Sequence, residues 1–529
     1  MNLNSVSTIQ TAPGNNRSEV FRTGSALLFL LGIMLFMYYT EFHSTQGALL
    51  IVSAMIGGYM AMNIGANDVA NNVGPAVGSN ALTLAGAIII AIIFESAGAL
   101  IAGGSVVSTI KNGIIDPALI GDRDTFIWLM MAALFAAAIW LNIATFLNAP
   151  VSTTHSIVGG VLGAGIAAGG WEIANWSQVS AIAASWIISP LMGGLIAAGF
   201  LFLIKHKIIY KKDKLEAAKK IVPLLVMLMA WSFSSYLILK GIKKIVKVEF
   251  SVALILGLVI AVVVYFLVRP FILRSAERLS NDKQSINSLF TIPLIVAAAL
   301  LCFAHGANDV ANAVGPLAAI YETISNSVSV TENIASKASI PLWVMIVGAS
   351  GIALGLLLYG PKLIKTVGSE ITELDQMRAF CIAMAAALTV IVATQLGLPV
   401  SSTHIALGAI FGIGFLRESI KASYDNMVIE ILHHHQDDDL KSNTVVTFLE
   451  EFRQATINEK KSILEQLKVK SVKAPLNKQD RKRLKKYYNN ELVKRSALYR
   501  IAAAWVITVP ASGLMAAFLY FSIRGFMLP

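Results

Sequence analysis

Charged residues are scarce in this sequence. Asp, Glu, Lys and Arg together make up 14% of the 529 residues, whereas hydrophobic residues make up 56%. A soluble domain typically needs about a quarter of its residues charged to cover its surface, so the composition excludes a soluble globular protein. Long apolar runs separated by short polar stretches indicate instead an all-α polytopic membrane protein.

Cysteine and the common enzyme motifs are also nearly absent. The only two cysteines, Cys302 and Cys381, lie inside apolar runs, which argues against a disulfide framework and against a cysteine metal site. The sequence has no GxSxG nucleophile elbow and no HExxH metal motif. We therefore expect a protein that is not an enzyme and that binds no cofactor.

Basic residues outnumber acidic ones, and they lie mostly beside apolar segments. The formal net charge is +11, which on its own could indicate binding to nucleic acid. Lys and Arg next to membrane spans are typical of loops on the cytoplasmic side, close to anionic lipid. We therefore predict a multi-pass protein of the cell membrane (inner or plasma), with the lipid bilayer and not nucleic acid as its partner.

Eleven apolar segments are each near the roughly 20 residues that cross about 30 Å of hydrocarbon. Two shorter segments, 150–170 and 399–414, open with Pro-Val-Ser-Ser/Thr-Thr-His and continue as apolar, Gly-rich sequence. Such short segments are candidates for re-entrant hairpins, and the total comes to about 11–13 transmembrane helices. The predicted spans are 24–40, 47–64, 81–101, 126–147, 179–204, 221–240, 248–268, 288–305, 341–359, 377–396 and 498–522.

Two motifs occur twice, in the same order. The signature GANDVANNVGP at Gly65–Pro75 matches GANDVANAVGP at Gly306–Pro316, 241 residues later. The hairpin motif PVSTTH at Pro150–His155 matches PVSSTH at Pro399–His404, 249 residues later. Duplicated halves that carry interrupted hydrophobic segments at matching positions are typical of secondary transporters, whose substrate site lies between the repeats.

The relative direction of the two repeats depends on how many crossings separate them. The eleven spans alone give six crossings between the signatures, which makes the repeats parallel and puts the Lys-rich loop 205–220 outside. One additional hidden crossing in each half makes the repeats inverted. It also places the loops 205–220 and 269–287 and the stretch 417–497 inside. Because positive charge favours the inside, we predict an inverted repeat with broken signature helices.

The apolar run near the N-terminus follows Arg17 and Arg22 and has no small-x-small cleavage site, so we expect a retained helix and not a signal peptide. The predicted organisation is a disordered N-terminus at 1–23, an extra transmembrane helix at 24–44, repeat 1 at 45–204, basic loops with connecting helices at 205–287, the core of repeat 2 at 288–416, a soluble basic helical insertion at 417–497 and a last transmembrane helix at 498–529.

Each signature places one carboxylate, Asp68 or Asp309, in apolar surroundings. Burying a carboxylate in a membrane costs at least ~2.5 kcal/mol, so we expect a cation or a proton as its partner. Gly and Pro disfavour a continuous helix here, and unwound backbone exposes carbonyl oxygens. Carboxylate and amide oxygens suit a hard cation such as Na⁺, although capping between packed helices is an alternative. The predicted coupling residues are Asp68, Asp309, Asn67, Asn308 and the intramembrane carboxylate Glu95.

The hairpin motifs have the pattern of a helix start, because Pro is followed by hydroxyl residues. A half-helix that begins at membrane depth presents free N–H donors and the positive end of its dipole, which can bind an anion without Lys or Arg. We therefore predict a small tetrahedral oxyanion as substrate, with simple capping as the alternative. The predicted donors are Ser152, Thr153, Thr154, Ser401, Ser402 and Thr403.

Three histidines lie beside these motifs. His155 and His404 end the hairpin motifs, and His305 precedes the second signature. The first signature has Ile64 at the position of His305. A histidine could titrate or donate to the anion, but we expect these three to support the site by orienting the hairpins.

With these motifs the sequence resembles the inorganic phosphate transporter (PiT) family. The resemblance rests on GANDVANNVGP, GANDVANAVGP, PVSTTH and PVSSTH, and it covers most of 45–415 and the last helix. It implies that Asn71 and Asn312 join the two aspartates in the cation and phosphate site, and that the six hairpin hydroxyls contact phosphate. Glu95 matches a glutamate important in animal members, whereas Ala383 stands where they carry a second one, which leaves the coupling stoichiometry open.

The predicted function is therefore secondary active symport of inorganic phosphate with Na⁺ or H⁺. A sulfate permease of the same family and, less favoured, an anion channel are the alternatives. Paired carboxylates deep in two repeats fit ion-coupled alternating access better than a channel. The sequence does not decide between Na⁺ and H⁺ as the coupling ion. The prediction is compatible with a homodimer.

Overall fold

The computed structural model describes residues 16–41, 45–146, 151–241, 248–325, 340–370, 374–420 and 495–528. Within these ranges the chain is helical, and its extended pairing is a bridge between Ile115 and Ala174. The described residues include 11 helical segments long and apolar enough to cross a membrane, and each overlaps one predicted span. The prediction of an all-α polytopic fold is confirmed. Most of the predicted insertion at 417–497 and of the N-terminus at 1–23 lies outside the described residues.

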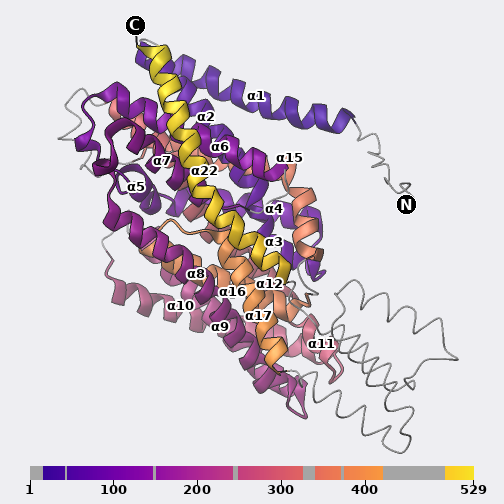
Figure 1. Cartoon of the computed structure of the whole chain (residues 1–529). Helices are drawn as coiled ribbons and strands as arrows, with labels where there is room; N and C mark the ends of the chain where they lie inside the picture. Colours follow the sequence, from indigo (N-terminus) through magenta and orange to yellow (C-terminus); the bar gives the residue numbers. More distant parts are fainter. Residues whose placement is uncertain are drawn as a thin grey trace, which may run out of the picture.

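The two signatures lie at the junctions of two helix pairs, and the residues around each signature are buried within the helical bundle that Figure 1 shows. The first pair is α2 (Thr45–Asn67) and α3 (Val69–Gly78), and the second is α12 (Thr291–Asp309) and α13 (Ala311–Ser325). The other described α-helices are α1 (Asn16–Glu41), α4 (Leu84–Ala102), α5 (Gly104–Asn112), α6 (Arg123–Phe146), α7 (Thr153–Gly169), α8 (Trp176–Ile204), α9 (Lys214–Lys240), α10 (Phe250–Ala276), α11 (Lys283–Ser288), α15 (Leu342–Glu370), α16 (Gln376–Gln395), α17 (Ser402–Ile420) and α22 (Arg495–Met527).

The predicted break in the first signature helix is present, but it is narrower than predicted. Asp68 alone separates α2 from α3, and its backbone stays helical at φ −88° and ψ −35°. Its N–H donates to the carbonyl of Ile64 at 2.9 Å, while the N–H of Asn71 donates to the carbonyl of Asp68 at 3.0 Å. The helix is therefore tightened at the aspartate and not unwound. Pro75 lies inside α3. A proline is tolerated there because neighbouring helices can compensate the missing backbone hydrogen bond within a membrane.

The helices α6 and α7 run out and back as a hairpin. The segment before α6 meets the segment after α7, where Ile115 pairs with Ala174 and the N–H of Asp116 donates to the carbonyl of Ile173 at 2.8 Å. Both outer ends of the pair therefore lie at one end of the molecule, and the start of α7 at Thr153 is buried within it.

The helices α16 and α17 form a second hairpin. Arg378 in the first turn of α16 and Arg417 in the last turn of α17 both act electrostatically on Lys205, at the end of α8. Both outer ends of this hairpin therefore meet at the end of the molecule where α8 ends. The additional hidden crossing that we predicted in each half is not found among the described residues. Instead, the predicted spans 126–147 and 377–396 correspond to α6 and α16, which are hairpin arms and not full crossings.

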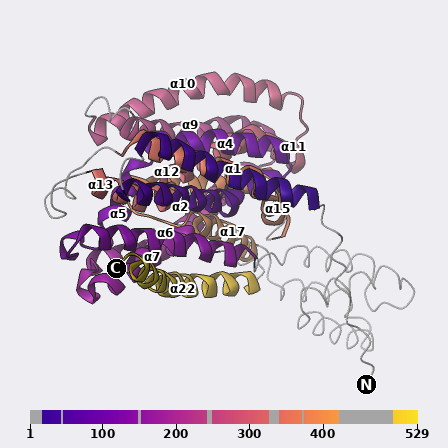
Figure 2. The ribbon, with the colours of Figure 1, turned by 90° about the horizontal axis from the view of Figure 1, so that it is seen from above.

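The hairpin arms are exchanged between the repeats. α7 packs against α22, as both ribbon views show, and α17 packs against α8 (Figures 1 and 2). Side chains would not fit at these contacts: a Cβ at Gly408 would lie 2.2 Å from the carbonyl oxygen of Pro190, and one at Gly163 would lie 2.2 Å from that of Gly513. Close helix contact therefore explains why both arms are rich in glycine.

The basic loops 205–220 and 269–287 lie side by side. The side-chain oxygen of Asn281 accepts from the backbone N–H groups of Lys214 and Leu215, at 2.8 and 3.1 Å. α10 runs along the edge of the bundle in Figure 2, and its apolar side chains are exposed, as at Ile255 (63%) and Phe266 (65%). Such a surface is expected to face lipid chains.

Candidate functional site

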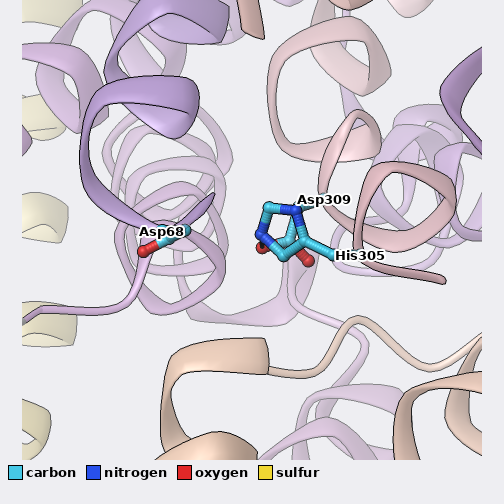
Figure 3. A group of neighbouring side chains, drawn as sticks. All are labelled: Asp68, His305 and Asp309. Carbon is cyan, nitrogen blue, oxygen red and sulfur yellow. Dashed lines mark ion pairs between the residues drawn. The ribbon is translucent and has the colours of Figure 1, made fainter. Parts of the chain in front are cut away.

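The two signature aspartates and His305 form one buried cluster (Figure 3). A carboxylate oxygen of Asp68, a ring nitrogen of His305 and a carboxylate oxygen of Asp309 all lie within 4.8 Å of one another. All three side chains are buried, with exposed fractions of 2% or less. Signatures 241 residues apart in the sequence therefore build a single site.

Both hairpin tips end on the carboxylate of Asp68. The hydroxyl of Thr153, at the start of α7, donates to Oδ2 at 2.7 Å. The hydroxyl of Thr403, in the first turn of α17, donates to Oδ1 at 3.0 Å. Two hydroxyls from different hairpins therefore share one acceptor group, which belongs to the first signature.

The signature amides reach the hairpins crosswise. Asn71 of the first signature donates to the hydroxyl of Thr403 at 2.9 Å. Asn312 of the second signature donates to the hydroxyl of Thr154 at 3.1 Å. Since Thr154 and Thr403 occupy the same place in the two hairpin motifs, each signature holds the hairpin of the other repeat.

The second aspartate receives a weaker version of the same contact. The hydroxyl of Ser402, which matches Thr153 in the repeat, donates to Oδ2 of Asp309 at 3.3 Å. Ser152 and Ser401 do not reach either aspartate: their hydroxyl oxygens accept the backbone N–H groups of His155 and His404, at 3.2 and 3.3 Å. These two serines therefore fix the helix starts, as the capping pattern predicts.

The remaining signature amides fasten the loops at the hairpin tips. Asn67 donates to the carbonyl of Val151 at 3.2 Å. Asn308 donates to the carbonyl of Leu398 at 3.1 Å and to the hydroxyl of Thr394 at 3.0 Å. Sequence reasoning missed Thr394, because a single hydroxyl within an apolar helix gives no signal until its partner is known.

Glu95 and His305 meet across two helices. Nδ1 of His305 lies 2.6 Å from Oε2 of Glu95, and Nε2 lies 3.0 Å from Oδ2 of Asp309. The amide of Asn72 donates to Oε1 of Glu95 at 2.9 Å. Glu95 is therefore connected to the site through His305, and His305 contacts Asp309 instead of a hairpin. We had not singled out Asn72 within its signature.

His155 and His404 lie together behind the hairpin tips. Their ring centroids are 4.7 Å apart, and the ring of Trp186 lies 3.8 Å from that of His155. The indole N–H of Trp186, which we also missed, donates to the carbonyl of Pro399 at 3.2 Å. These side chains join the two hairpins to each other and to α8.

The fold and the site define a multi-pass membrane transport protein, with carboxylates, amides and hydroxyls buried where two repeats and two hairpins meet. Comparison with known proteins specifies it further. A model of the phosphate transporter family matches residues 64–516, and the chain belongs to this family. Its members are transporters and not enzymes, which agrees with the resemblance found in the sequence.

Similar proteins match either nearly the whole chain or about 71% of it. A Helicobacter pylori protein named "Putative phosphate permease" is 52% identical over 98% of each chain. A protein of the same name from Haemophilus influenzae is 38% identical over 71% of this chain and 90% of its own length. A solved structure titled "The sodium-dependent phosphate transporter" is similar with a TM-score of 0.73 and 29% identity, covering 91% of this chain and 100% of that one.

Proposed function

We propose that this chain is a secondary active symporter that carries inorganic phosphate together with Na⁺. Membership of the phosphate transporter family and the name of the similar solved structure support this proposal. The observation that carries it is the double contact at Asp68, where Thr153 and Thr403 donate from the two hairpin tips.

The double contact suggests how a cation promotes phosphate binding. While Asp68 is a bare carboxylate, it accepts the two threonine hydroxyls, which are then oriented away from any other acceptor. A cation on Asp68 satisfies the carboxylate and releases both hydroxyls to donate to phosphate, beside two helix N-termini that favour an anion. Cation binding before phosphate binding follows from this competition.

The second signature offers oxygen atoms that suit a hard cation. Oδ1 of Asp309 and Oδ1 of Asn312 are buried and have no hydrogen-bond partner among the described residues. Buried acceptors without a donor are costly, and Na⁺ would satisfy both. Hydrogen phosphate also carries an O–H that a signature oxygen not taken by the cation can accept, whereas sulfate carries no proton at neutral pH. A site with such an acceptor discriminates against sulfate, which favours phosphate.

We also infer that the two repeats are inverted. The outer ends of α6 and α7 lie beside the segment that leads into α8, whereas those of α16 and α17 lie near Lys205, where α8 ends. The equivalent hairpins of the two repeats therefore enter from opposite ends of the molecule, as inverted repeats require. Inverted repeats allow alternating access, in which one group of helices moves against the other around a fixed site.

The proposal is tested by Na⁺-driven uptake of ³²P-phosphate in proteoliposomes. Asp68→Asn and Asp309→Asn should each lower uptake at least about tenfold, the effect of losing about 1.4 kcal/mol of binding free energy. Glu172→Gln, which changes an exposed carboxylate away from the site, is the matched control. Wild-type uptake by both aspartate variants would overturn the assignment.

Two further uptake experiments identify the coupling ion and distinguish a symporter from a channel. Replacing Na⁺ by choline at fixed pH should abolish uptake, whereas uptake that persists and follows a proton gradient would assign the coupling to H⁺. A Na⁺ gradient alone should accumulate phosphate against its own electrochemical gradient. A channel cannot do so, and excess sulfate should compete only weakly.

A further inference from the structure

Three positions distinguish the surroundings of the two signature aspartates. His305 corresponds to Ile64 and Asn72 to Ala313, by the offset of the repeated signatures. The third pair is identified from the residues that the two equivalent signature glycines contact where helices cross. A Cβ at Gly306 would lie 2.2 Å from the carbonyl oxygen of Glu95, and a Cβ at the equivalent Gly65 would lie 1.9 Å from that of Ile352. Glu95 on α4 therefore corresponds to Ile352 on α15.

The three polar members of these pairs form one connected chain. Asn72 bonds to Glu95 at 2.9 Å, Glu95 to His305 at 2.6 Å, and His305 lies 3.0 Å from Asp309. Each of the three side chains is fully buried. In the other half, the three matching side chains are Ile64, Ile352 and Ala313, which are apolar.

The two aspartates are consequently held in different ways. Both oxygens of Asp68 accept threonine hydroxyls. In contrast, His305 and Ser402 both lie against the same oxygen of Asp309, Oδ2, while Oδ1 has no partner among the described side chains. The position of the His305 ring therefore decides which oxygen of Asp309 remains available.

We propose that Asn72 is a positioning residue for a cation at Asp309. It anchors the carboxylate of Glu95, Glu95 orients the ring of His305, and the ring occupies Oδ2 so that Oδ1 faces the cation. The two aspartates then provide unequal sites, of which the Asp309 site depends on Asn72. This inference rests on the proposed function, in which cations bind at the signature aspartates.

Equilibrium binding of ²²Na⁺ to the purified full chain tests the proposal, together with ³²P-phosphate uptake. Asn72→Ala, which introduces the residue of the other half, should raise the half-saturating Na⁺ concentration about tenfold in both assays. The phosphate KM at saturating Na⁺ should change less than about twofold. The control is Ser53→Ala, because the hydroxyl of Ser53, which is buried on α2, donates to the carbonyl of Leu49 within its own helix and should leave both assays unchanged.

A double-mutant cycle separates positioning from a general structural effect. If Asn72 acts through Glu95, then Asn72→Ala should add nothing in a Glu95→Ala background. Should Asn72→Ala prove unable to fold, the triple variant Asn72→Ala/Glu95→Ile/His305→Ile reproduces the apolar set of the other half. It leaves no buried carboxylate without a partner, and it should fold with the same loss of Na⁺ affinity.

Each outcome has a definite meaning. Additive effects in the cycle, or an Asn72→Ala variant whose Na⁺ dependence is unchanged while its phosphate KM rises, would overturn the inference and leave the proposed function standing. Wild-type Na⁺ affinity in the triple variant would do the same. A wild-type protein that neither binds ²²Na⁺ nor responds to it in uptake would instead overturn the proposed Na⁺ symport, and the inference with it.

Discussion

At the residue scale, the hydroxyls of Thr153 and Thr403 have a choice of acceptor. Each donates to Asp68 at 2.7 and 3.0 Å respectively, and each stands at the start of a half-helix where an anion is favoured. A hydrogen bond to a charged group typically contributes about 1.5–3 kcal/mol. A single cation bound to Asp68 can therefore shift the hydrogen bonds of these two hydroxyls from the carboxylate to phosphate.

Thr153→Val and Thr403→Val should each weaken phosphate binding, because valine keeps the shape of threonine but removes the donor. We expect the phosphate KM at saturating Na⁺ to rise about tenfold, which corresponds to about 1.4 kcal/mol. The matched control is Thr389→Val, whose hydroxyl donates at 2.8 Å to the carbonyl of Ala385 in its own helix. Uptake kinetics measure the difference, and an equal response of all three variants would contradict a direct role.

At the element scale, the signature helices pass their neighbours at contacts too close for side chains. α12 crosses α4 where a Cβ at Gly306 would lie 2.2 Å from the backbone of Glu95, and a Cβ at Gly98 would lie 2.0 Å from that of Phe303. Backbone cannot swing aside as a flexible side chain can. These crossings set the depth at which Asp309 lies and the place where Glu95 meets His305.

Gly306→Ala should therefore destabilise the protein. Forcing atoms into a packed contact typically costs about 1–3 kcal/mol, so we expect a lower melting temperature in detergent and a lower yield of monodisperse protein. Gly24→Ala on α1 is the control, since a Cβ there would meet nothing within 4 Å. A melting temperature equal to that of wild type would show that the crossing can relax.

At the scale of the whole molecule, the hairpins enter from opposite ends and meet at the site. The outer ends of α6 and α7 lie beside the Ile115–Ala174 bridge, whereas those of α16 and α17 lie near Lys205. The basic loops gather at this second end, where Asn281 bonds to Lys214. Positive charge favours the cytoplasmic side, so we expect this end to be inside.

Cysteine labelling tests this orientation. The native residues Cys302 and Cys381 are both buried, so a membrane-impermeant maleimide should report an introduced cysteine. Lys212→Cys should react only in inside-out vesicles, and Glu172→Cys only in right-side-out vesicles. Labelling of both variants from the same side would contradict the arrangement in which the hairpins enter from opposite ends.

Much of the fold could be predicted because it depends on local composition. A run of about 20 apolar residues has to cross the bilayer as a helix, whatever its neighbours are, and all eleven predicted spans overlap helices of the structure. The duplicated motifs likewise predicted side chains that the structure brings together, since a carboxylate such as Asp68 in an apolar run needs a partner. The direction in which α6 and α16 run was missed, because a hairpin arm and a full crossing have the same composition.

The sequence by itself thus determined the helical membrane fold and the two repeated motifs, and it predicted most of the polar side chains that the structure brings together around Asp68 and Asp309. Only the tertiary structure decided that both hairpin tips meet on Asp68, and that Asn72, Glu95 and His305 form a chain ending on Asp309. Hydrogen bonds require donors and acceptors within about 3 Å. Between residues as distant in sequence as Glu95 and His305, only the packing of helices at their glycine contacts can set that distance.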